Sequence, residues 1–199
     1  MNELVFFLEE ESARVLLGKI VPKLISDRTE VHPRFIVFEG KQDLERQLLK
    51  KLRGYVNPRA RFIVMRDQDQ TDCKKVKRSL ASICAHAGRP ATKIRIACRE
   101  LESFYLGDLQ AVETGLCIPG LAGRQMKAMF RDPDKLVAPS IELAKLTGNQ
   151  YQKVGGSRAI APYLNLEASR SRSFHHLIKA IRSAIHEFQS SGNQFRQAE

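Results

Sequence analysis

Short apolar runs alternate with amphipathic stretches over the first hundred residues. The runs cover residues 4–8, 34–38, 62–65 and 93–98. The runs 4–8 and 62–65 are continuous, as in strands that are covered on both faces, and 34–38 predicts a further strand. Residues 93–98 alternate apolar and polar positions and predict a strand near a sheet edge. Helically spaced apolar positions follow residue 11 and recur over 43–52 and 73–87. This order predicts an α/β fold with an open, mostly parallel sheet of about four strands flanked by helices.

The second half of the chain has a different pattern. Residues 100–147 are helical in pattern and are interrupted by Pro119, Pro133 and Pro139, and residues 148–162, with Gly155 and Gly156 at their centre, predict a loop. Residues 174–189 predict a helix with one apolar face, which should pack on the rest of the protein. We therefore divide the chain into an α/β core, 1–110, and a helical C-terminal extension, 111–199, packed on it as a single compact unit.

Composition narrows the class of protein. The content of 43% hydrophobic and 28% charged residues is that of a globular protein. No apolar run approaches the roughly 20 residues of a membrane span, and the first residues do not resemble a secretion leader, so we expect a cytoplasmic protein. The four cysteines have no zinc-site spacing, and we expect them to be buried free thiols.

The net charge of +11 predicts an attraction to polyanions, of which nucleic acid is the usual one. Lys74, Lys75 and Arg78 follow directly on an acidic turn and are candidates for binding the phosphate backbone. The alternative is that these residues form an ordinary solvated helix face.

Acidic residues follow three of the four predicted strands. Glu9, Glu10 and Glu11 follow the first; Asp67 and Asp69 follow the third; and the fourth leads to a further group that includes Glu102. Because the carboxyl ends of parallel strands meet at one edge of a sheet, these carboxylates should lie on the same rim. Their mutual repulsion would be relieved by protonation or by a cation, and oxygen ligands favour Mg²⁺ or Mn²⁺.

Helix capping is the alternative for part of this set. Acidic residues and Ser or Asp at the start of a helix are favoured by its dipole and by its unpaired N–H groups. Ser12, Glu11 and Asp72 stand where such caps are expected. Glu9, Asp67 and Asp69 stand earlier, at the strand ends, and for these we favour a metal site.

Familiar catalytic motifs are missing from the sequence. It contains no phosphate-binding GxxxxGK[ST] loop, no GxGxxG fingerprint and no GxSxG elbow. A nucleotide-handling phosphotransferase therefore has no recognisable nucleotide loop. With no Trp and four Tyr, the sequence also shows no aromatic platform for stacking bases.

Several longer stretches resemble a known family. They are Glu9-Glu10-Glu11-Ser12 after the first strand, Val64-Met65-Arg66-Asp67-Gln68-Asp69 with Cys73 beyond, Glu100-Leu101-Glu102-Ser103-Phe104-Tyr105-Leu106-Gly107-Asp108, Ile160-Ala161-Pro162-Tyr163-Leu164 and Ser171-Arg172-Ser173-Phe174. Together they resemble the bacterial domain-of-unknown-function 4276 family over nearly the whole chain. The third stretch is the most specific.

This resemblance implies a Toprim-like fold, similar to the catalytic domain of topoisomerases, primases and overcoming-lysogenization-defect nucleases. The Toprim pattern of a Glu after the first strand and an Asp-x-Asp after the third, holding Mg²⁺, would correspond to Glu9, Asp67 and Asp69, with Glu102 as a further candidate from the family's own motif. The family resemblance also implies a bacterial antiphage or mobile-element setting, with a separately encoded ATPase as partner. Where the Toprim pattern has Gly after its Glu, this sequence has Glu10, which leaves open whether the site is active.

The leading hypothesis is a nuclease that depends on Mg²⁺ or Mn²⁺. Glu9, Asp67 and Asp69 would be the metal ligands. Glu102 or Glu11 would complete the site, and a basic residue such as Lys74 would lie beside the phosphate. The alternative is a non-catalytic effector or sensor subunit that binds a partner ATPase. Its surface would be the basic residues of the C-terminal third, Arg124, Lys127, Arg131 and Lys135.

Overall fold

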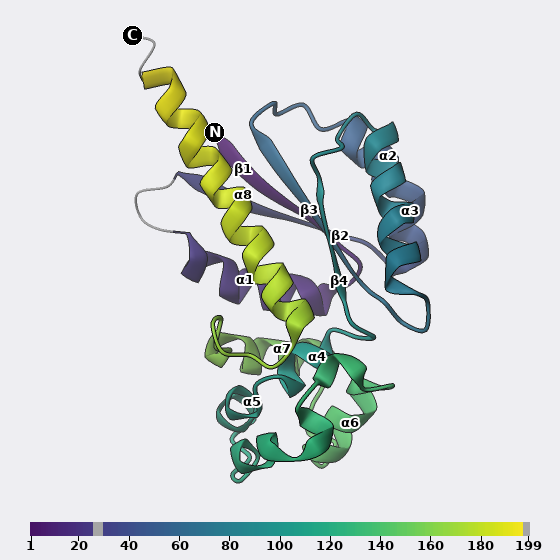
Figure 1. Cartoon of the computed structure of the whole chain (residues 1–199), viewed down its shortest axis with the longest axis vertical. Coiled ribbons are helices and arrows are strands. Elements are labelled where there is room, and N and C mark those ends of the chain that lie inside the picture. The colour runs from purple at the N-terminus through teal and green to yellow at the C-terminus, as the bar shows by residue number, and fades with distance from the viewer. Residues whose placement is uncertain (26–29, 197–199) are drawn as a thin grey trace.

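The computed structural model describes residues 1–25 and 30–196, with side chains described as far as residue 190 (Figure 1). The last residues of the predicted C-terminal extension, 197–199, lie outside the described residues. Strands β1 (Asn2–Leu8), β2 (Val31–Val37), β3 (Ala60–Asp67) and β4 (Lys93–Ala97) form one sheet in the order β2-β1-β3-β4. All pairs of neighbouring strands are parallel, and β4 lies at an edge, as its alternating pattern predicts.

The register aligns the carboxyl ends of the two central strands. Leu8, the last residue of β1, is opposite Met65 of β3 and Val37 of β2. Asp67, the last residue of β3, is opposite Ala97 of β4. The acidic residues that follow these strands therefore start from the same rim, as expected of parallel strands.

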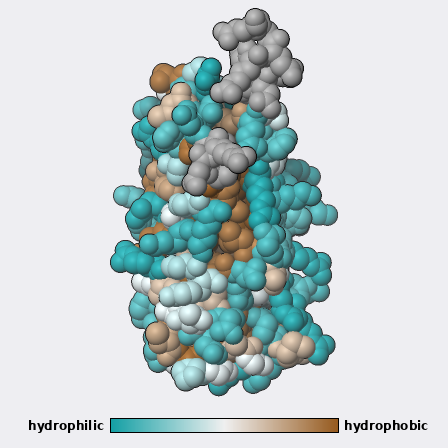
Figure 2. Space-filling model, turned by 90° about the vertical axis from the view of Figure 1, so that its left-hand side faces the viewer, coloured by the Kyte–Doolittle hydropathy of each residue, from teal (hydrophilic) through white to brown (hydrophobic). Residues whose placement is uncertain are grey.

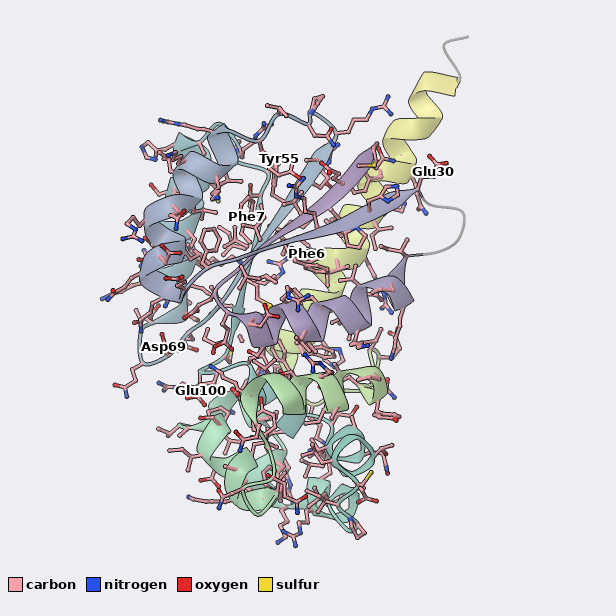
Figure 3. All side chains as sticks on the ribbon, turned by 180° about the vertical axis from the view of Figure 1, so that it is seen from behind. Phe6, Phe7, Glu30, Tyr55, Asp69 and Glu100 are labelled. Atoms are coloured by element: carbon pink, nitrogen blue, oxygen red, sulfur yellow. The ribbon has the colours of Figure 1, made fainter. Side chains whose placement is uncertain are left out.

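Helices cover both faces of the sheet. Helices α2 (Lys41–Arg53) and α3 (Cys73–His86) lie on one face, and α1 (Glu11–Leu24) and the long α8 (Arg172–Arg196) lie on the other (Figure 1). Phe6 and Phe7 point to opposite faces (Figure 3), and both are fully buried. Each face thus has its own hydrophobic core, which explains why β1 reads as a continuous apolar run.

A smaller helical part lies at the carboxyl end of the sheet (Figure 1). It contains helices α4 (Glu102–Leu106), α5 (Leu109–Leu116), α6 (Pro139–Leu146) and α7 (Lys153–Ile160) and the 3₁₀ segments η1 (Ala122–Met126), η2 (Ala128–Phe130), η3 (Pro133–Lys135) and η4 (Ala161–Tyr163). Pro133 and Pro139 each begin an element, because proline is tolerated in the first turn of a helix. Helix α7 packs against α1 and α5 and so joins this part to the core.

The prediction of a loop over 148–162 is wrong, because α7 and η4 occupy most of it. Gly156 is required by packing: a Cβ atom there would meet the ring of Tyr151 more closely than real Cβ atoms do. Gly155 has open space around it. The Gly-Gly pair therefore marks the close approach of a tyrosine ring to a helix.

The surface is largely polar. The face shown in Figure 2 is mostly hydrophilic, with a narrow hydrophobic strip along its length. Among the described residues, no helix has both the length and the apolar character needed to cross a bilayer.

Candidate functional site

Two acidic residues meet where the central strands end. Glu9 follows β1 directly, and Asp67 is the last residue of β3. The backbone N–H of Asp67 donates a hydrogen bond to Oε2 of Glu9 at 2.9 Å. The pairing of Leu8 with Met65 positions the two residues for this bond.

Asp67 is the most perturbed carboxyl group at this rim. Its residue is 8% exposed. Burial raises the pKa of Asp67 well above its ordinary value, and the charges of Glu10, Glu9 and Glu102 raise it further, while Lys153 opposes them. Asp67 thus lies among other acids in a poorly solvated place, where protonation or a bound cation relieves the repulsion.

Glu102 enters this group from α4, in the helical part. It is 1% exposed, and its Oε1 accepts a hydrogen bond from the Tyr151 hydroxyl at 3.0 Å. Its other oxygen, Oε2, is buried and has no hydrogen-bond partner among the described residues. Burial raises the pKa of Glu102, as it does that of Glu9, where the Asp67 N–H and Arg66 offset part of the effect. An orphaned buried carboxylate oxygen is costly unless a proton or a cation reaches it.

Asp69 faces a different set of partners. Its backbone has a left-handed conformation, with φ of 56°, and its carboxylate pairs with Lys41 Nζ at 2.7 Å and with Arg66 Nη2 at 3.4 Å. Figure 3 shows Asp69 and Glu100 on either side of the junction between the sheet and the helical part. The structure therefore brings Glu9, Asp67 and Glu102 together and directs Asp69 toward cations of the α2 side.

Arg66 holds the α2 side of the rim together. Its side chain is 4% exposed, and its Nε donates to the carbonyl oxygen of Asp67 at 2.9 Å. Its Nη1 pairs with Glu45 at 2.5 Å, and its Nε lies 3.8 Å from Glu9 Oε2. One buried guanidinium thus contacts Glu9 after β1, Glu45 in α2 and Asp69 in the turn after β3.

Glu10 and Lys153, two further members of the rim, form a pair that no local sequence pattern indicates. Lys153, the first residue of α7, forms a salt bridge with Glu10, whose other oxygen accepts a hydrogen bond from Ser12. Burial alone would lower the pKa of Lys153, but Glu10, Glu102 and Asp67 raise it. The only sequence signal for this lysine is its place beside Tyr151 and the Gly-Gly pair, which we assigned to a loop.

The acidic rim, as we call Glu9, Glu10, Asp67 and Glu102, is an incomplete metal site as it stands. Within residues 1–25 and 30–190, no group of three or more His, Cys, Asp or Glu side chains is arranged so that it could hold an ion. Lys153 instead supplies a positive charge next to the acids.

Comparison with protein families decides the relationship that the motifs suggest. The family model described as "Domain of unknown function (DUF4276)" matches residues 8–182. The chain belongs to this family. The match includes the whole acidic rim and Lys153, so these residues lie within the DUF4276 domain. Comparison with curated proteins and with solved structures finds no match.

The basic residues predicted to bind phosphate lie at the start of α3 in the DUF4276 domain but face different surfaces. Asp72 caps this helix by accepting from the N–H groups of Lys74 and Lys75, as the capping alternative predicts. The side chain of Lys74 lines a cleft beside β4, that of Lys75 lines a pocket next to Lys41 and Arg66, and Arg78 is exposed outside both.

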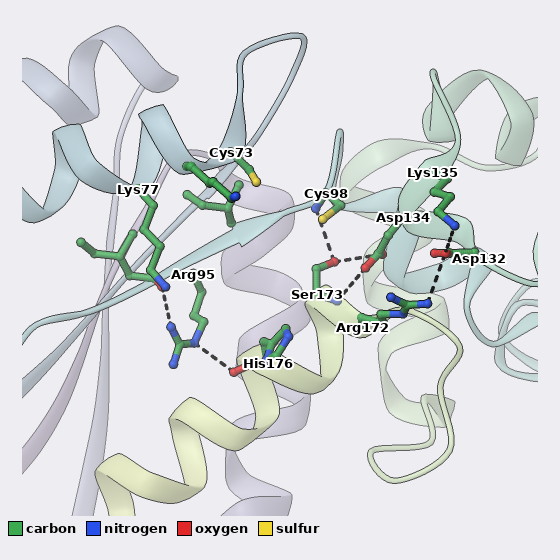
Figure 4. Close-up of a pocket in the computed structure, with 13 residues that line it drawn as sticks. Cys73, Lys77, Arg95, Cys98, Asp132, Asp134, Lys135, Arg172, Ser173 and His176 are labelled. Atoms are coloured by element: carbon green, nitrogen blue, oxygen red, sulfur yellow. Dashed lines mark hydrogen bonds and ion pairs between the residues drawn. The ribbon is translucent and has the colours of Figure 1, made fainter.

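A hollow at the edge of the sheet, which we call the β4-edge cleft, has a volume of about 560 Å³ (Figure 4). It lies between α3, β4, η3 and the start of α8. Its lining residues are Cys73, Lys74, Lys77, Ile94, Arg95, Ile96, Cys98, Asp132, Asp134, Lys135, Arg172, Ser173 and His176.

All four cysteines are free thiols, as predicted, but only part of the expectation of burial is met. Cys84 is buried and Cys98 is half-buried, whereas Cys73 and Cys117 are exposed. Cys73 begins α3 and Cys117 ends α5 in a left-handed conformation, and helix ends are more accessible than the apolar stripes of helices.

Proposed function

We propose that this protein is a Toprim-like nuclease that depends on Mg²⁺ or Mn²⁺ and hydrolyses phosphodiester bonds of nucleic acid. The observation that carries the proposal is the convergence of Glu9, Asp67 and Glu102 at the carboxyl end of the sheet, where burial raises the pKa of each carboxyl group. Open α/β sheets bind ligands at this edge. Perturbed carboxyl groups in such a place are typical of catalytic sites.

The donor chemistry fits a hard divalent ion. All the candidate ligands are carboxylate oxygens, which Mg²⁺ and Mn²⁺ prefer. The unrelieved repulsion at Asp67 is the feature that such an ion would satisfy, whereas the orphaned Oε2 of Glu102 can hold a proton. Because no three of these groups form a site as they stand, we propose that the ion binds together with the substrate phosphate, whose oxygens complete the donor set.

Each residue of the rim has a role in this proposal. Asp67 and Glu9 hold the ion, which would polarise the scissile phosphate and stabilise the charge on the leaving oxygen. Glu102 carries a proton to or from the reacting oxygens, because its pKa is raised and Tyr151 fixes its position. Lys153 keeps a positive charge beside the phosphate. Glu11 has no such role, since its carboxylate pairs with Arg14.

The test is cleavage of end-labelled single-stranded DNA, duplex DNA and RNA by the purified protein in Mn²⁺, alone and with a separately encoded ATPase from a neighbouring gene. We expect cleavage by the wild type and its loss in Asp67→Asn. Glu167→Gln, which removes an exposed carboxylate paired with Arg182, should cut like the wild type. No cleavage of any substrate by the wild type, or equal cleavage by Asp67→Asn, would contradict the proposal.

The proposal also includes the cellular system in which the nuclease acts and its protein partner. A cytoplasmic bacterial antiphage or mobile-element system, with an ATPase as partner, is what the family resemblance implies. Nucleic acid is the substrate that the charge of +11 supports.

A second candidate is a non-catalytic effector or sensor subunit that binds the ATPase. It is favoured by the protein's own cations on the acids, Lys153 on Glu10 and Lys41 on Asp69. Exposed apolar side chains also lie in the same segment as the predicted basic surface of Arg124, Lys127, Arg131 and Lys135: Met126 is 68% exposed and Val137 80%. If this candidate is right, Asp67→Asn leaves biological activity and complex formation intact, whereas Arg131→Glu breaks the complex.

A further inference from the structure

The β4-edge cleft has an excess of positive charge. Its lining contains five Lys or Arg residues and two Asp residues. Figure 4 shows Lys77 and Arg95 toward one end and Lys135 and Arg172 toward the other, with Cys98 and Ser173 between them.

Both acids of the cleft are neutralised or bonded within the protein. Asp132 pairs with Lys135 Nζ at 3.0 Å and with Arg172 Nη2 at 3.6 Å. Asp134 accepts hydrogen bonds from the Ser171 hydroxyl and from the N–H and hydroxyl of Ser173, and so caps α8. The acids therefore have partners of their own and leave the remaining cations available.

The remaining cations have no acidic partner. Lys74 and Lys77 are exposed and form no ion pair with any residue that the structure describes. Within the part of the chain that the structure describes, Arg95 donates only to carbonyl oxygens, those of His176 at 2.9 Å and of Ile94 at 2.6 Å. Three positive charges from α3 and β4 thus face one hollow without compensation, which favours an anion there.

The floor of the cleft is apolar. Ile94, Ile96 and Cys98, all from β4 and the residue that follows it, contribute to it. A simple anion needs no such floor, whereas a nucleotide offers both a phosphate and a flat base. The volume of about 560 Å³ is within the range of small-ligand pockets and takes a few unpaired nucleotides at most. A duplex keeps its bases paired and stacked inside, so only an unpaired strand can lay a base on this apolar floor.

The cleft leads to the acidic rim. Its floor strand pairs with β3 so that Ala97 lies opposite Asp67, and Cys98, the next residue, lines the cleft. From Cys98 the chain turns within a few residues into α4, which carries Glu102. A strand bound along β4 would therefore pass from the basic cleft toward the buried carboxylates.

We propose that the β4-edge cleft binds a single strand of nucleic acid through its phosphates, with Lys74, Lys77 and Arg95 as the principal contacts. This deepens the proposed function, because it names the form of the substrate and the path by which it reaches the acidic rim. The cleft has no Phe, Tyr or Trp in its lining, so binding combines phosphate contacts with apolar contact between a base and the floor; it is indifferent to base sequence and strongly salt-dependent.

The experiment measures the affinity of the full-length protein for a fluorescent single-stranded oligonucleotide by anisotropy, in EDTA so that no cleavage occurs. Lys74→Glu/Lys77→Glu is compared with Lys19→Glu/Lys50→Glu, which changes the charge equally at two exposed lysines outside the cleft. The cleft variant should bind on the order of tenfold more weakly or worse, and the slope of log affinity against log salt should fall by about 1.4, since each phosphate contact contributes about 0.7. The control variant should bind like the wild type within about twofold, because screening weakens distant exposed charges.

Equal affinity of the cleft variant and the wild type would overturn the proposal, as would tighter binding of a duplex than of the single strand. Polyphosphate of matched charge that binds as tightly as the oligonucleotide would also overturn it, because the cleft would then select no base-bearing strand. Binding lost in the cleft variant but kept in Asp67→Asn supports it, even if the wild type never cuts. The proposal of strand binding in the cleft and the proposal of nuclease activity can therefore be refuted independently of each other.

Thiol labelling locates the bound strand without any variant. Cys73 lines the cleft, and the exposed Cys117 lies outside it at the end of α5. The oligonucleotide should slow maleimide labelling of Cys73 several-fold and leave Cys117 unchanged, as read by mass spectrometry. Equal labelling of Cys73 with and without the oligonucleotide would contradict binding in the cleft.

Discussion

The backbone N–H of Asp67 donates a hydrogen bond to the Glu9 carboxylate at 2.9 Å, and this bond joins the ends of the two central strands. The donor is a main-chain group, so a substitution at Asp67 that keeps the backbone leaves Glu9 in place. The effects of removing the Asp67 carboxylate can therefore be measured apart from the position of Glu9.

Asp67→Asn should stabilise the metal-free protein at neutral pH. Burial and the neighbouring acids raise the pKa of Asp67, so the folded state binds its proton more tightly than the unfolded chain does. The free energy of unfolding therefore falls as the pH rises from about 4 through the folded pKa, and the carboxamide avoids this loss. We expect a gain of about 1–3 kcal/mol at neutral pH, shrinking as the pH falls toward about 4, in urea denaturation with EDTA.

Glu167→Gln provides a comparison of opposite sign. Its hydrogen bond with Arg182 lowers the pKa of Glu167, so any stability that this carboxylate contributes is present at neutral pH and is lost as the pH falls through the folded pKa. If Asp67→Asn instead lowers the free energy of unfolding at neutral pH, and this difference from the wild type does not change as the pH falls, the Asp67 carboxylate is not buried among other acids.

Asp67 and Asp69 should differ as metal ligands. Asp67 lies among Glu9, Glu10 and Glu102, whereas Asp69 is held by Lys41 and Arg66. In calorimetric titration with Mn²⁺ and a non-hydrolysable single strand, Asp67→Asn should lose metal binding, by about a hundredfold or more in affinity, and Asp69→Asn should lose less than about tenfold. The reverse order would show that Asp69 leaves its cations when the metal binds, and that the Toprim Asp-x-Asp pattern describes the site better than this arrangement does.

Arg66→Met should destabilise the protein by about 2 kcal/mol or more. The buried guanidinium is the shared partner of Glu9, Glu45 and Asp69, and removing it leaves acids uncompensated at the rim. Arg46→Met is the matched control, because the Arg46 side chain is 77% exposed and, among the described residues, pairs only with Asp43, so solvent screens the interaction and its loss should change stability little. Urea denaturation measures the free energy of unfolding of both variants. An equal loss of stability in the two would contradict a special role for Arg66.

Gly156→Ala and Gly155→Ala should have opposite effects. A Cβ atom at Gly156 would meet the ring of Tyr151, so this variant should lose about 1–3 kcal/mol of stability. At Gly155 the nearest atom outside the helix is Gln152 Cβ at 3.9 Å, so alanine should gain about 0.5–1 kcal/mol from its greater helix propensity.

The same pair tests the link from Tyr151 to the candidate site. Displacement of Tyr151 removes its hydrogen bond to Glu102, so any cleavage should fall in Gly156→Ala and persist in Gly155→Ala at a temperature where both variants are folded. Equal thermal midpoints for the two variants would contradict the close packing of α7 on the tyrosine.

The sheet was predictable because its determinants are local. Continuous apolar runs identify β1 and β3, which are buried on both faces, and the alternation over residues 93–98 identifies β4 as an edge strand. Parallel strands then place Glu9 and Asp67 on one rim without further information. Helix α7 escaped prediction because Gly-Gly-Ser is common in loops, and the ring that requires Gly156 is visible only in the folded protein.

The composition of the site was less predictable. The Asp-x-Asp spacing suggested a pair of ligands, but the left-handed backbone at Asp69 directs this residue to Lys41 and Arg66. Lys153 lies more than 140 residues from Glu10 in sequence, and nothing local to either residue indicates the contact. Pairs of this kind depend on how α7 packs on α1, which the periodicity of neither helix specifies.

The position of α8 has a consequence for the order of events during synthesis. This helix shares a core with α1, β1 and β3, and its Phe174 ring lies 5.2 Å from that of Phe104 in α4. Until the ribosome has released the residues from Arg172 onward, one side of the sheet and the anchor of α4 are without their cover. A nascent chain therefore has its acidic residues long before it has the framework that sets Glu102 against Asp67, and the complete site arises only once α8 has left the ribosome and packed on the sheet.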